Sequence, residues 1–163
     1  MFHLSRRSFV ALVAGASASL TLPAARGLFA ADKPAALKIG IQSYSLRNFP
    51  ADKAIDIVAD LGFEHIEFFD GHYSLNSNDD QIAARKKLMA EKKLRTSAHG
   101  VNGFNKDHEA NRKKFEFAKK AGIKTLAADP TEDAFDSLDK LVAEYDIRIA
   151  IHNHGPGARY NMV

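Results

Sequence analysis

Leu61-Gly-Phe-Glu-His-Ile-Glu67 decides the fold, because it joins the tail of a predicted helix to the start of a predicted strand. After the helix come an apolar residue, a charged residue and then residues that suit a strand. The same order recurs at Lys93-Leu-Arg-Thr-Ser97, Ala121-Gly-Ile-Lys-Thr-Leu126 and Tyr145-Asp-Ile-Arg-Ile-Ala150. With a first strand near residue 39, the strand starts lie roughly 24 to 30 residues apart, which is the size of one β/α unit.

Apolar residues recur at helical spacing between the predicted strands. The clearest stripe consists of Phe135, Leu138, Leu141, Val142 and Tyr145. Strands that alternate with helices predict a parallel sheet with right-handed crossovers. A closed barrel of this kind needs eight strands and about 250 residues. We therefore expect an α/β fold, a parallel (β/α) barrel of TIM type that is incomplete, with about five of the eight units. An open five-stranded sheet is the alternative.

The amino-terminal segment has the pattern of an export signal. Ser5-Arg-Arg-Ser-Phe-Val10 carries paired arginines, an apolar run follows from about residue 9 to residue 22, and small residues come next. The run is short for a bilayer, which takes about 20 residues. We predict a twin-arginine signal at 1–31, a linker at 32–37 and the partial barrel at 38–163, in a periplasmic or secreted protein without a stable membrane span. An uncleaved membrane anchor is the alternative.

The basic balance of the chain belongs to this predicted signal. Residues 1–31 contain Arg6, Arg7 and Arg26 and no acidic residue, so removing them leaves 20 Lys and Arg against 20 Asp and Glu. Nucleic-acid binding draws on a surplus of cations, and the remainder has none. The chain also lacks cysteine, so no disulfide stabilises the core. We expect no nucleic-acid partner.

Every predicted strand ends on side chains that can carry acid, base or metal chemistry. In a parallel barrel, such groups from many strands meet at the carboxyl-terminal rim. A shared rim is therefore the expected site. The polar strand-end residues are Tyr44, Glu67, Asp70, His99, Asp129, His152 and His154.

His152-Asn-His154 is the strongest local pattern. Residues two apart on a strand point to the same side, so both imidazoles would face the barrel axis and Asn153 the helices. Alternatively, the strand ends by Asn153 and His154 belongs to the Gly-Pro-Gly loop. Neutral imidazole is a ligand for transition metals and a general base near neutral pH. The alternative is a pair of hydrogen-bonded histidines with a purely structural role.

The other strand-end residues each have a structural alternative. Glu67 either faces the barrel lumen or belongs to a buried ion pair. His99 precedes Gly100, which permits close backbone approach and thus contact with a ligand. Asp129 either contacts a ligand or caps the helix that follows Pro130. The chain lacks a G-x-S-x-G elbow and Gly-rich phosphate loops. The sequence therefore gives no support for catalysis by a nucleophilic serine or for a nucleotide-phosphate site.

Four stretches carry a resemblance to a known family: Ile39-Gly-Ile-Gln-Ser-Tyr-Ser-Leu46, Gly62-Phe-Glu-His-Ile-Glu67, Thr96-Ser-Ala-His99 and Ile149-Ala-Ile-His-Asn-His-Gly155. They resemble the sugar phosphate isomerase/epimerase superfamily, the xylose isomerase-like TIM barrels. The resemblance covers nearly all of the chain after the signal, and it matches the first five β/α units of the family's eight.

The resemblance implies isomerisation or epimerisation of a carbohydrate through proton transfer next to a carbonyl, by way of an enediolate. It implies a divalent metal (Mn, Zn, Mg or Co), with His152 at a ligand position where the family usually has glutamate. We assign catalysis to Glu67, His99 and His154, and substrate binding to Tyr44, Asp129 and Asn153. The alternative is a catalytically inactive half-barrel that binds carbohydrate or forms a homo-oligomer. A DNA-repair nuclease on this fold is disfavoured by the neutral charge and the signal.

Overall fold

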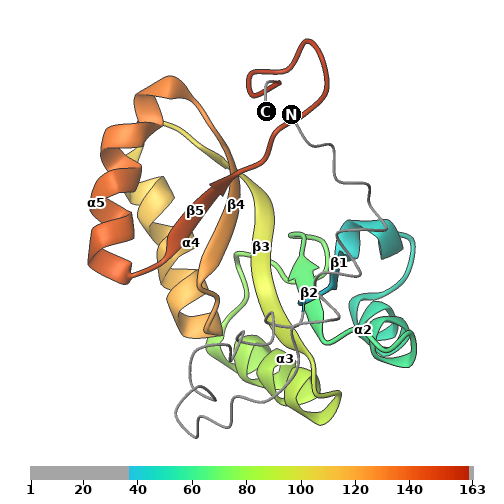
Figure 1. The fold of residues 1–163 in the computed structure, drawn as a ribbon. Coiled ribbons are helices and arrows are strands. Elements are labelled where there is room, and N and C mark those ends of the chain that lie inside the picture. The colour runs from blue at the N-terminus through green and yellow to red at the C-terminus, as the bar shows by residue number, and fades with distance from the viewer. Residues whose placement is uncertain (1–36, 162–163) are drawn as a thin grey trace, which may run out of the picture. The chain divides into compact units, whose positions relative to one another are not determined.

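Five strands form one parallel sheet in the order β1-β2-β3-β4-β5 (Figure 1). The computed structural model describes residues 37–161, so the predicted signal at 1–31 lies outside the described residues. The strands are β1 (Gly40–Gln42), β2 (His65–Phe68), β3 (Arg95–Phe104), β4 (Thr125–Pro130) and β5 (Arg148–Ile151).

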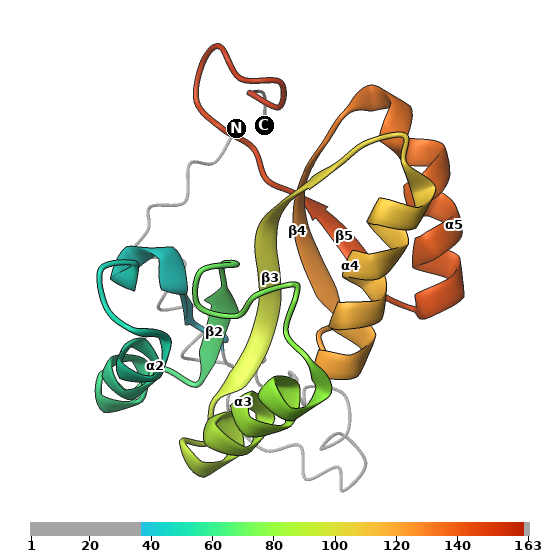
Figure 2. The same ribbon diagram turned by 180° about the vertical axis from the view of Figure 1, so that it is seen from behind.

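Helices follow the first four strands and pack on one face of the sheet (Figures 1 and 2). They are the 3₁₀ turn η2 (Ser43–Leu46), α2 (Ala51–Asp60), α3 (Asp79–Glu91), α4 (His108–Ala121), the 3₁₀ turn η3 (Glu132–Ala134) and α5 (Phe135–Tyr145). The predicted alternation of strands and helices is confirmed. Among residues 37–161, no helix combines the length and the apolar character that a membrane crossing requires.

Local sequence explains where the helices begin and end. α3 begins with a capping box, in which the Asn78 side chain accepts from the Gln81 N–H and the Gln81 side chain accepts from the Asn78 N–H. α4 ends at Ala121, and the next residue, Gly122, has the φ of 75° that glycine adopts without strain after a helix. Thr131 precedes η3, but its hydroxyl donates to the Phe104 carbonyl and caps no helical N–H.

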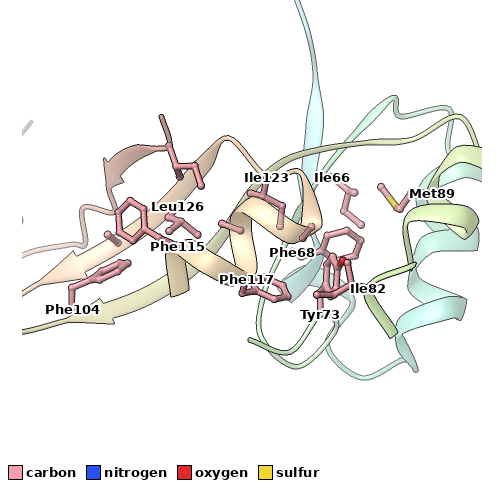
Figure 3. Packing of buried hydrophobic residues seen from close by; sticks show 14 of the residues in the cluster. Ile66, Phe68, Tyr73, Ile82, Met89, Phe104, Phe115, Phe117, Ile123 and Leu126 are labelled. Carbon is pink, nitrogen blue, oxygen red and sulfur yellow. The ribbon is translucent and has the colours of Figure 1, made fainter. Parts of the chain in front are cut away.

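The core lies between the helices and one face of the sheet (Figure 3). Ile66 and Phe68 of β2 are fully buried there, and Phe68 meets Tyr73 edge-on at 5.4 Å between ring centroids. Phe117 of α4 continues this contact, 5.0 Å from Tyr73. Burying an aromatic side chain of this size contributes about 1.5–3 kcal/mol. Of the stripe predicted for α5, Leu138 and Leu141 are buried in this core and Val142 and Tyr145 pack against it, whereas Phe135 is 40% exposed.

Two strands end differently from the prediction. β3 runs five residues beyond His99, because Asn102, Gly103 and Phe104 pair with Ala128, Asp129 and Pro130 of β4. β5 ends at Ile151, so His152, Asn153 and His154 all follow the strand. The carboxyl ends of all five strands still lie at one edge of the sheet, because the strands are parallel.

Candidate functional site

The face of the sheet that points away from the helices is called the inner face here, and it carries most of the predicted site. On β2, Ile66 and Phe68 point into the helix-side core, so the alternate residue Glu67 points to the inner face. On β4, Leu126 and Ala128 are fully buried in the core, so Asp129 also lies on the inner face. Glu67 and Asp129 therefore share a face at the carboxyl edge of the sheet.

Glu67 is half-buried at the end of β2. Burial raises the pKa of its carboxyl above the ordinary value of 4.5, while the charge of His152 and the amide of Gln42 act in the opposite direction. A carboxylate with a raised pKa is a stronger proton acceptor than an exposed one. Ile151 pairs with the core-facing Ala128 of β4, so the next residue, His152, falls on the inner face by alternation.

His152 and His154 lie together directly after β5. Their ring centroids are 4.7 Å apart and their planes are inclined by 72°. The His152 N–H donates to the Ala128 carbonyl (2.8 Å), which extends the pairing with β4 by one residue. His154 donates its N–H to the Tyr160 carbonyl (2.9 Å), so it belongs to the loop, as the second of the two sequence interpretations expects. Asn153 between them is exposed.

The loop after β5 folds back onto the end of β4. Arg159 and Tyr160 both donate side-chain hydrogen bonds to the Pro130 carbonyl, at 2.6 and 2.9 Å. Arg159 also lies 3.8 Å from Asp129 Oδ1, a buried oxygen that has no hydrogen-bond partner among the described residues. Asp129 does not cap the following helix, since Thr131 occupies the residue before η3. The Asp129 side chain is 40% exposed overall, although its Oδ1 atom is buried beside Arg159.

Tyr44 presents an exposed aromatic ring at the same edge. It lies on η2, directly after β1, with 54% of its surface exposed. The ring contacts Phe69 edge-on at 5.4 Å, and the Arg47 guanidinium lies 4.7 Å from its centroid. These contacts fix the ring while leaving much of it open to solvent. A fixed, exposed aromatic ring suits contact with a ligand.

The structure places His99 away from these residues. His99 is the register partner of Phe68, so its ring points into the helix-side core and is fully buried. Its Nε2 donates to the Tyr73 carbonyl (2.8 Å), and its ring lies 5.3 Å from that of Phe117. Burial lowers the pKa of this imidazole, so its neutral form is favoured. The expectation that His99 shares the rim with Glu67 is corrected, because Ala98 and not His99 is paired with Glu67.

A metal site needs at least three converging ligands, and the described residues do not supply one. Among residues 37–161, no group of three His, Asp or Glu side chains lies close enough to hold an ion. His152 and His154 offer two neighbouring imidazoles, which is an incomplete donor set. We therefore derive no chemical step through a metal, and the assignment of His152 as a ligand stays a prediction.

One residue at this edge was not singled out from the sequence. Gln42, at the end of β1, is the register partner of Glu67 and donates from Nε2 to the Gly100 carbonyl (3.1 Å). The signal that could have found it is its place at a strand end, one strand away from Glu67. An amide was passed over because it neither titrates nor commonly binds metals.

A second polar group, called the helix cluster, lies between α4 and α5. His108 Nδ1 is 2.8 Å from Ser137 Oγ, an arrangement that could suggest a nucleophilic serine. However, Arg112 donates to His108 Nε2 (3.1 Å), so the ring proton lies on Nδ1 and His108 donates to the serine. His108 cannot accept the hydroxyl proton in this arrangement. The members of the helix cluster are His108, Asn111, Arg112, Ser137, Glu144 and Tyr145.

Three solved structures share this fold. A protein of uncharacterised function from Parabacteroides distasonis superposes with a TM-score of 0.65 and 26% identity, over 72% of this chain and 53% of its own. A xylose isomerase domain-containing protein from Salmonella typhimurium gives 0.59 and 16%, over 76% and 51%. D-psicose 3-epimerase, determined in the presence of D-fructose, gives 0.59 and 16%, over 78% and 55%.

These likenesses support the fold class. The chain spans about half the length of the structures it matches, in agreement with the predicted partial barrel of TIM type. No family model matches the chain, and no curated protein matches it significantly. The fold is thus that of proteins named for sugar isomerisation and epimerisation.

Proposed function

We propose that this protein is a carbohydrate isomerase or epimerase that transfers a proton next to a carbonyl, with Glu67 as the proton acceptor. The observation that carries this proposal is the half-buried Glu67 on the inner face, whose pKa is raised by burial. It lies at the strand edge where parallel barrels hold their active sites. The likeness to D-psicose 3-epimerase supports the choice of a sugar as the substrate class.

The proton transfer balances without a nucleophile or a redox group. The Glu67 carboxylate removes the proton from the carbon beside the carbonyl, and the bonding electrons move to the carbonyl oxygen to form an enediolate. Return of the proton to the former carbonyl carbon isomerises the sugar, provided that the hydroxyl proton of the adjacent carbon passes to the former carbonyl oxygen and a new carbonyl forms there. Return of the proton to the opposite face of the original carbon, with the carbonyl restored, epimerises the sugar. The second case needs an acid on the other side, for which His154 is the candidate. His99 has no part in this proposal, because its ring lies in the core.

The remaining predicted residues take binding roles in the proposal. The exposed ring of Tyr44 would pack against a sugar face. The Asp129 side chain is 40% exposed beside Arg159, and its carboxylate would accept a hydrogen bond from a sugar hydroxyl. Asn153 lies exposed between the two histidines and can donate or accept a hydrogen bond.

The test is isotope exchange with the full chain. Free aldoses and ketoses are incubated with the protein in D₂O, and NMR detects deuterium at the carbon next to the carbonyl. We expect exchange into at least one sugar at a rate above the buffer control. Absence of exchange with every sugar would reject the proposal. Metal analysis of the purified protein tests the predicted divalent ion separately.

A second candidate function is a binding protein without catalysis that self-associates. The outer side of β5 beside α5 carries an apolar groove of about 360 Å³, lined by Phe135, Leu138, Val142, Ile149 and Ile151 among others. Ile151, a large apolar side chain on β5, is 41% exposed, and among residues 37–161 β5 pairs with β4 alone. Light scattering on the full chain tests this candidate, and a monodisperse monomer would reject the association.

Export by the twin-arginine route also belongs to the proposal, and its residues lie outside the described part of the chain. The paired arginines Arg6 and Arg7 carry it. Changing both to lysine keeps the charge, and we expect this to retain the protein inside the cell. Cell fractionation with an antibody to the protein gives the readout. Unchanged export of the double variant would reject this route.

A further inference from the structure

Gln42 lies beside Glu67 at the carboxyl edge of the sheet. The two residues are register partners on the neighbouring parallel strands β1 and β2. Registered residues of adjacent strands present their side chains on the same face. The amide of Gln42 is therefore an inner-face neighbour of the Glu67 carboxylate.

Two hydrogen bonds fix the orientation of the Gln42 amide. Nε2 donates to the Gly100 carbonyl of β3 (3.1 Å), and Oε1 accepts from the backbone N–H of Tyr44. A carbonyl oxygen can only accept and a backbone N–H can only donate. A flipped amide would therefore lose both bonds, so the orientation is determined by its partners.

The fixed orientation decides which atom Gln42 offers to Glu67. Nε2 carries two hydrogens, and the Gly100 carbonyl takes one of them. The other is free for the neighbouring carboxylate, and Gln42 is one of the groups that stabilise the charged form of Glu67. Hydrogen bonds to an ionised acceptor are about twice as strong as neutral ones.

We infer that Gln42 is the positioning residue of this site, which holds the Glu67 carboxylate and the Tyr44 ring in one fixed relation. This inference rests on the proposed role of Glu67. Gln42 links three neighbouring strands through one side chain: it lies on β1, bonds to Gly100 on β3 and faces Glu67 on β2. Through Oε1 it also holds the first turn of η2, on which Tyr44 lies. It acts through these residues and takes up no proton.

The first test needs no enzymatic activity. In ¹H–¹⁵N spectra of the full chain, the side-chain amide signals of Gln42 are compared between the wild type, Glu67→Gln and the control Glu64→Gln, whose residue is exposed just before β2. We expect the Gln42 signals to move in Glu67→Gln and to stay in place in Glu64→Gln. Gln42 signals that are equal in all three proteins would overturn the inference.

The second test uses the exchange assay with three variants. Gln42→Ala removes all the hydrogen bonds, and Gln42→Glu keeps the size but, once ionised, cannot donate. We expect both to lower kcat by about 10- to 100-fold with little change in KM, because the misplaced base reacts more slowly. The control Gln81→Ala removes the chain's other glutamine, whose side chain serves the capping box of α3, and should leave kcat unchanged.

The two tests separate the inference from the proposed function. If the wild type shows no exchange, the proposed function fails, while the NMR comparison still decides the placement of Gln42. If the wild type is active and Gln42→Glu keeps full activity, the side chain only fills space and the inference is wrong. If Gln42→Ala fails to fold, the NMR comparison of the Glu67 variant still tests the contact in a protein with Gln42 intact.

Discussion

The inner-face site and the helix cluster contain similar residue types but leave them in different states. In the helix cluster, Asn111 donates to the Asn105 carbonyl and to Ser137, and the His108 ring is held from both sides by Ser137 and Arg112. At the inner face, the Asp129 Oδ1 atom has no hydrogen-bond partner among residues 37–161, and burial raises the pKa of Glu67.

The difference teaches that composition does not distinguish a site from a structural network. A polar network with every atom partnered stabilises the packing of its helices. A buried polar atom without a hydrogen bond costs stability, and a carboxyl at a strand end whose pKa is raised by burial is a candidate for proton transfer. The comparison predicts that variants at the two places separate activity from stability.

The largest expected effect is on activity at the inner face. Glu67→Gln removes the proton acceptor while keeping the shape, so kcat for proton exchange should fall by about 10²- to 10⁴-fold. Glu64→Gln, at an exposed residue near the start of β2, should match the wild type. Isotope exchange by NMR measures both. Full activity of the Glu67 variant would remove this residue from the mechanism.

The next largest expected effect is a loss of stability at Gly100, on the central strand β3. A Cβ added to Gly100 would lie 2.4 Å from the Ala127 carbonyl oxygen, a backbone atom of the adjacent strand. Gly100→Ala should therefore destabilise the protein by about 3 kcal/mol. Gly103→Ala on the same strand meets no atom within 4 Å, so it serves as a matched control. Denaturant unfolding followed by circular dichroism measures both, and equal stabilities would contradict this close approach.

A smaller loss of stability is expected in the helix cluster. Asn111 is fully buried, and its amide donates hydrogen bonds to the Asn105 carbonyl and to Ser137. Asn111→Ala removes both of these hydrogen bonds. We expect a loss of about 2 kcal/mol, with kcat unchanged at temperatures where the variant is folded. Asn76→Ala at an exposed position is the control for loss of an amide. A lower kcat for folded Asn111→Ala would contradict this expectation, because it would show that the helix cluster affects the inner-face site.

The smallest effect is a pH dependence of stability at Glu67. Its pKa is raised in the folded protein, so the folded state binds this proton more tightly than the unfolded state. The resulting stability is fully present below about pH 4.5 and is lost as the pH rises through the raised pKa. Glu67→Gln should gain stability relative to the wild type across this window.

Urea unfolding of both proteins from acid to neutral pH measures this difference. The gain should appear only as the wild-type carboxyl ionises. A Glu67→Gln variant that becomes less stable than the wild type as the pH rises would show that the carboxylate is favourably paired. Activity has the opposite dependence, because proton removal needs the ionised form and should fall on the acid side of the same pKa.

Much of the fold was predictable, because its signals are local. The order that ends in Ile66 and Glu67 repeats along the chain, and Gly122 indicates a helix end by a φ that glycine adopts without strain. The position of Glu67 on the inner face follows from simple alternation with Ile66 and Phe68. The ends of the strands were less predictable, since β3 extends through pairing with residues that are distant in sequence.

The face of the sheet to which His99 points could not be predicted either, because it also depends on pairing between strands that are distant in sequence. The register between β2 and β3 shifts between Ile66 and Glu67, so that Thr96 pairs with Ile66 but Ala98 pairs with Glu67. A shift of one residue turns a side chain to the opposite face of a sheet. The orientation of the Gln42 amide was equally hidden, because its partner Gly100 lies 58 residues away.

The sequence by itself determined the alternation of strands and helices, the polar residues at the strand ends and the apolar stripes that form the core. Each of these depends on residues within one or two turns or on simple periodicity. Only the tertiary structure decided which strand-end residues meet, because side-chain facing depends on the pairing of distant strands. For that reason Glu67, Asp129 and His152 lie on the inner face, whereas His99, which is also a polar residue at a predicted strand end, is buried in the core.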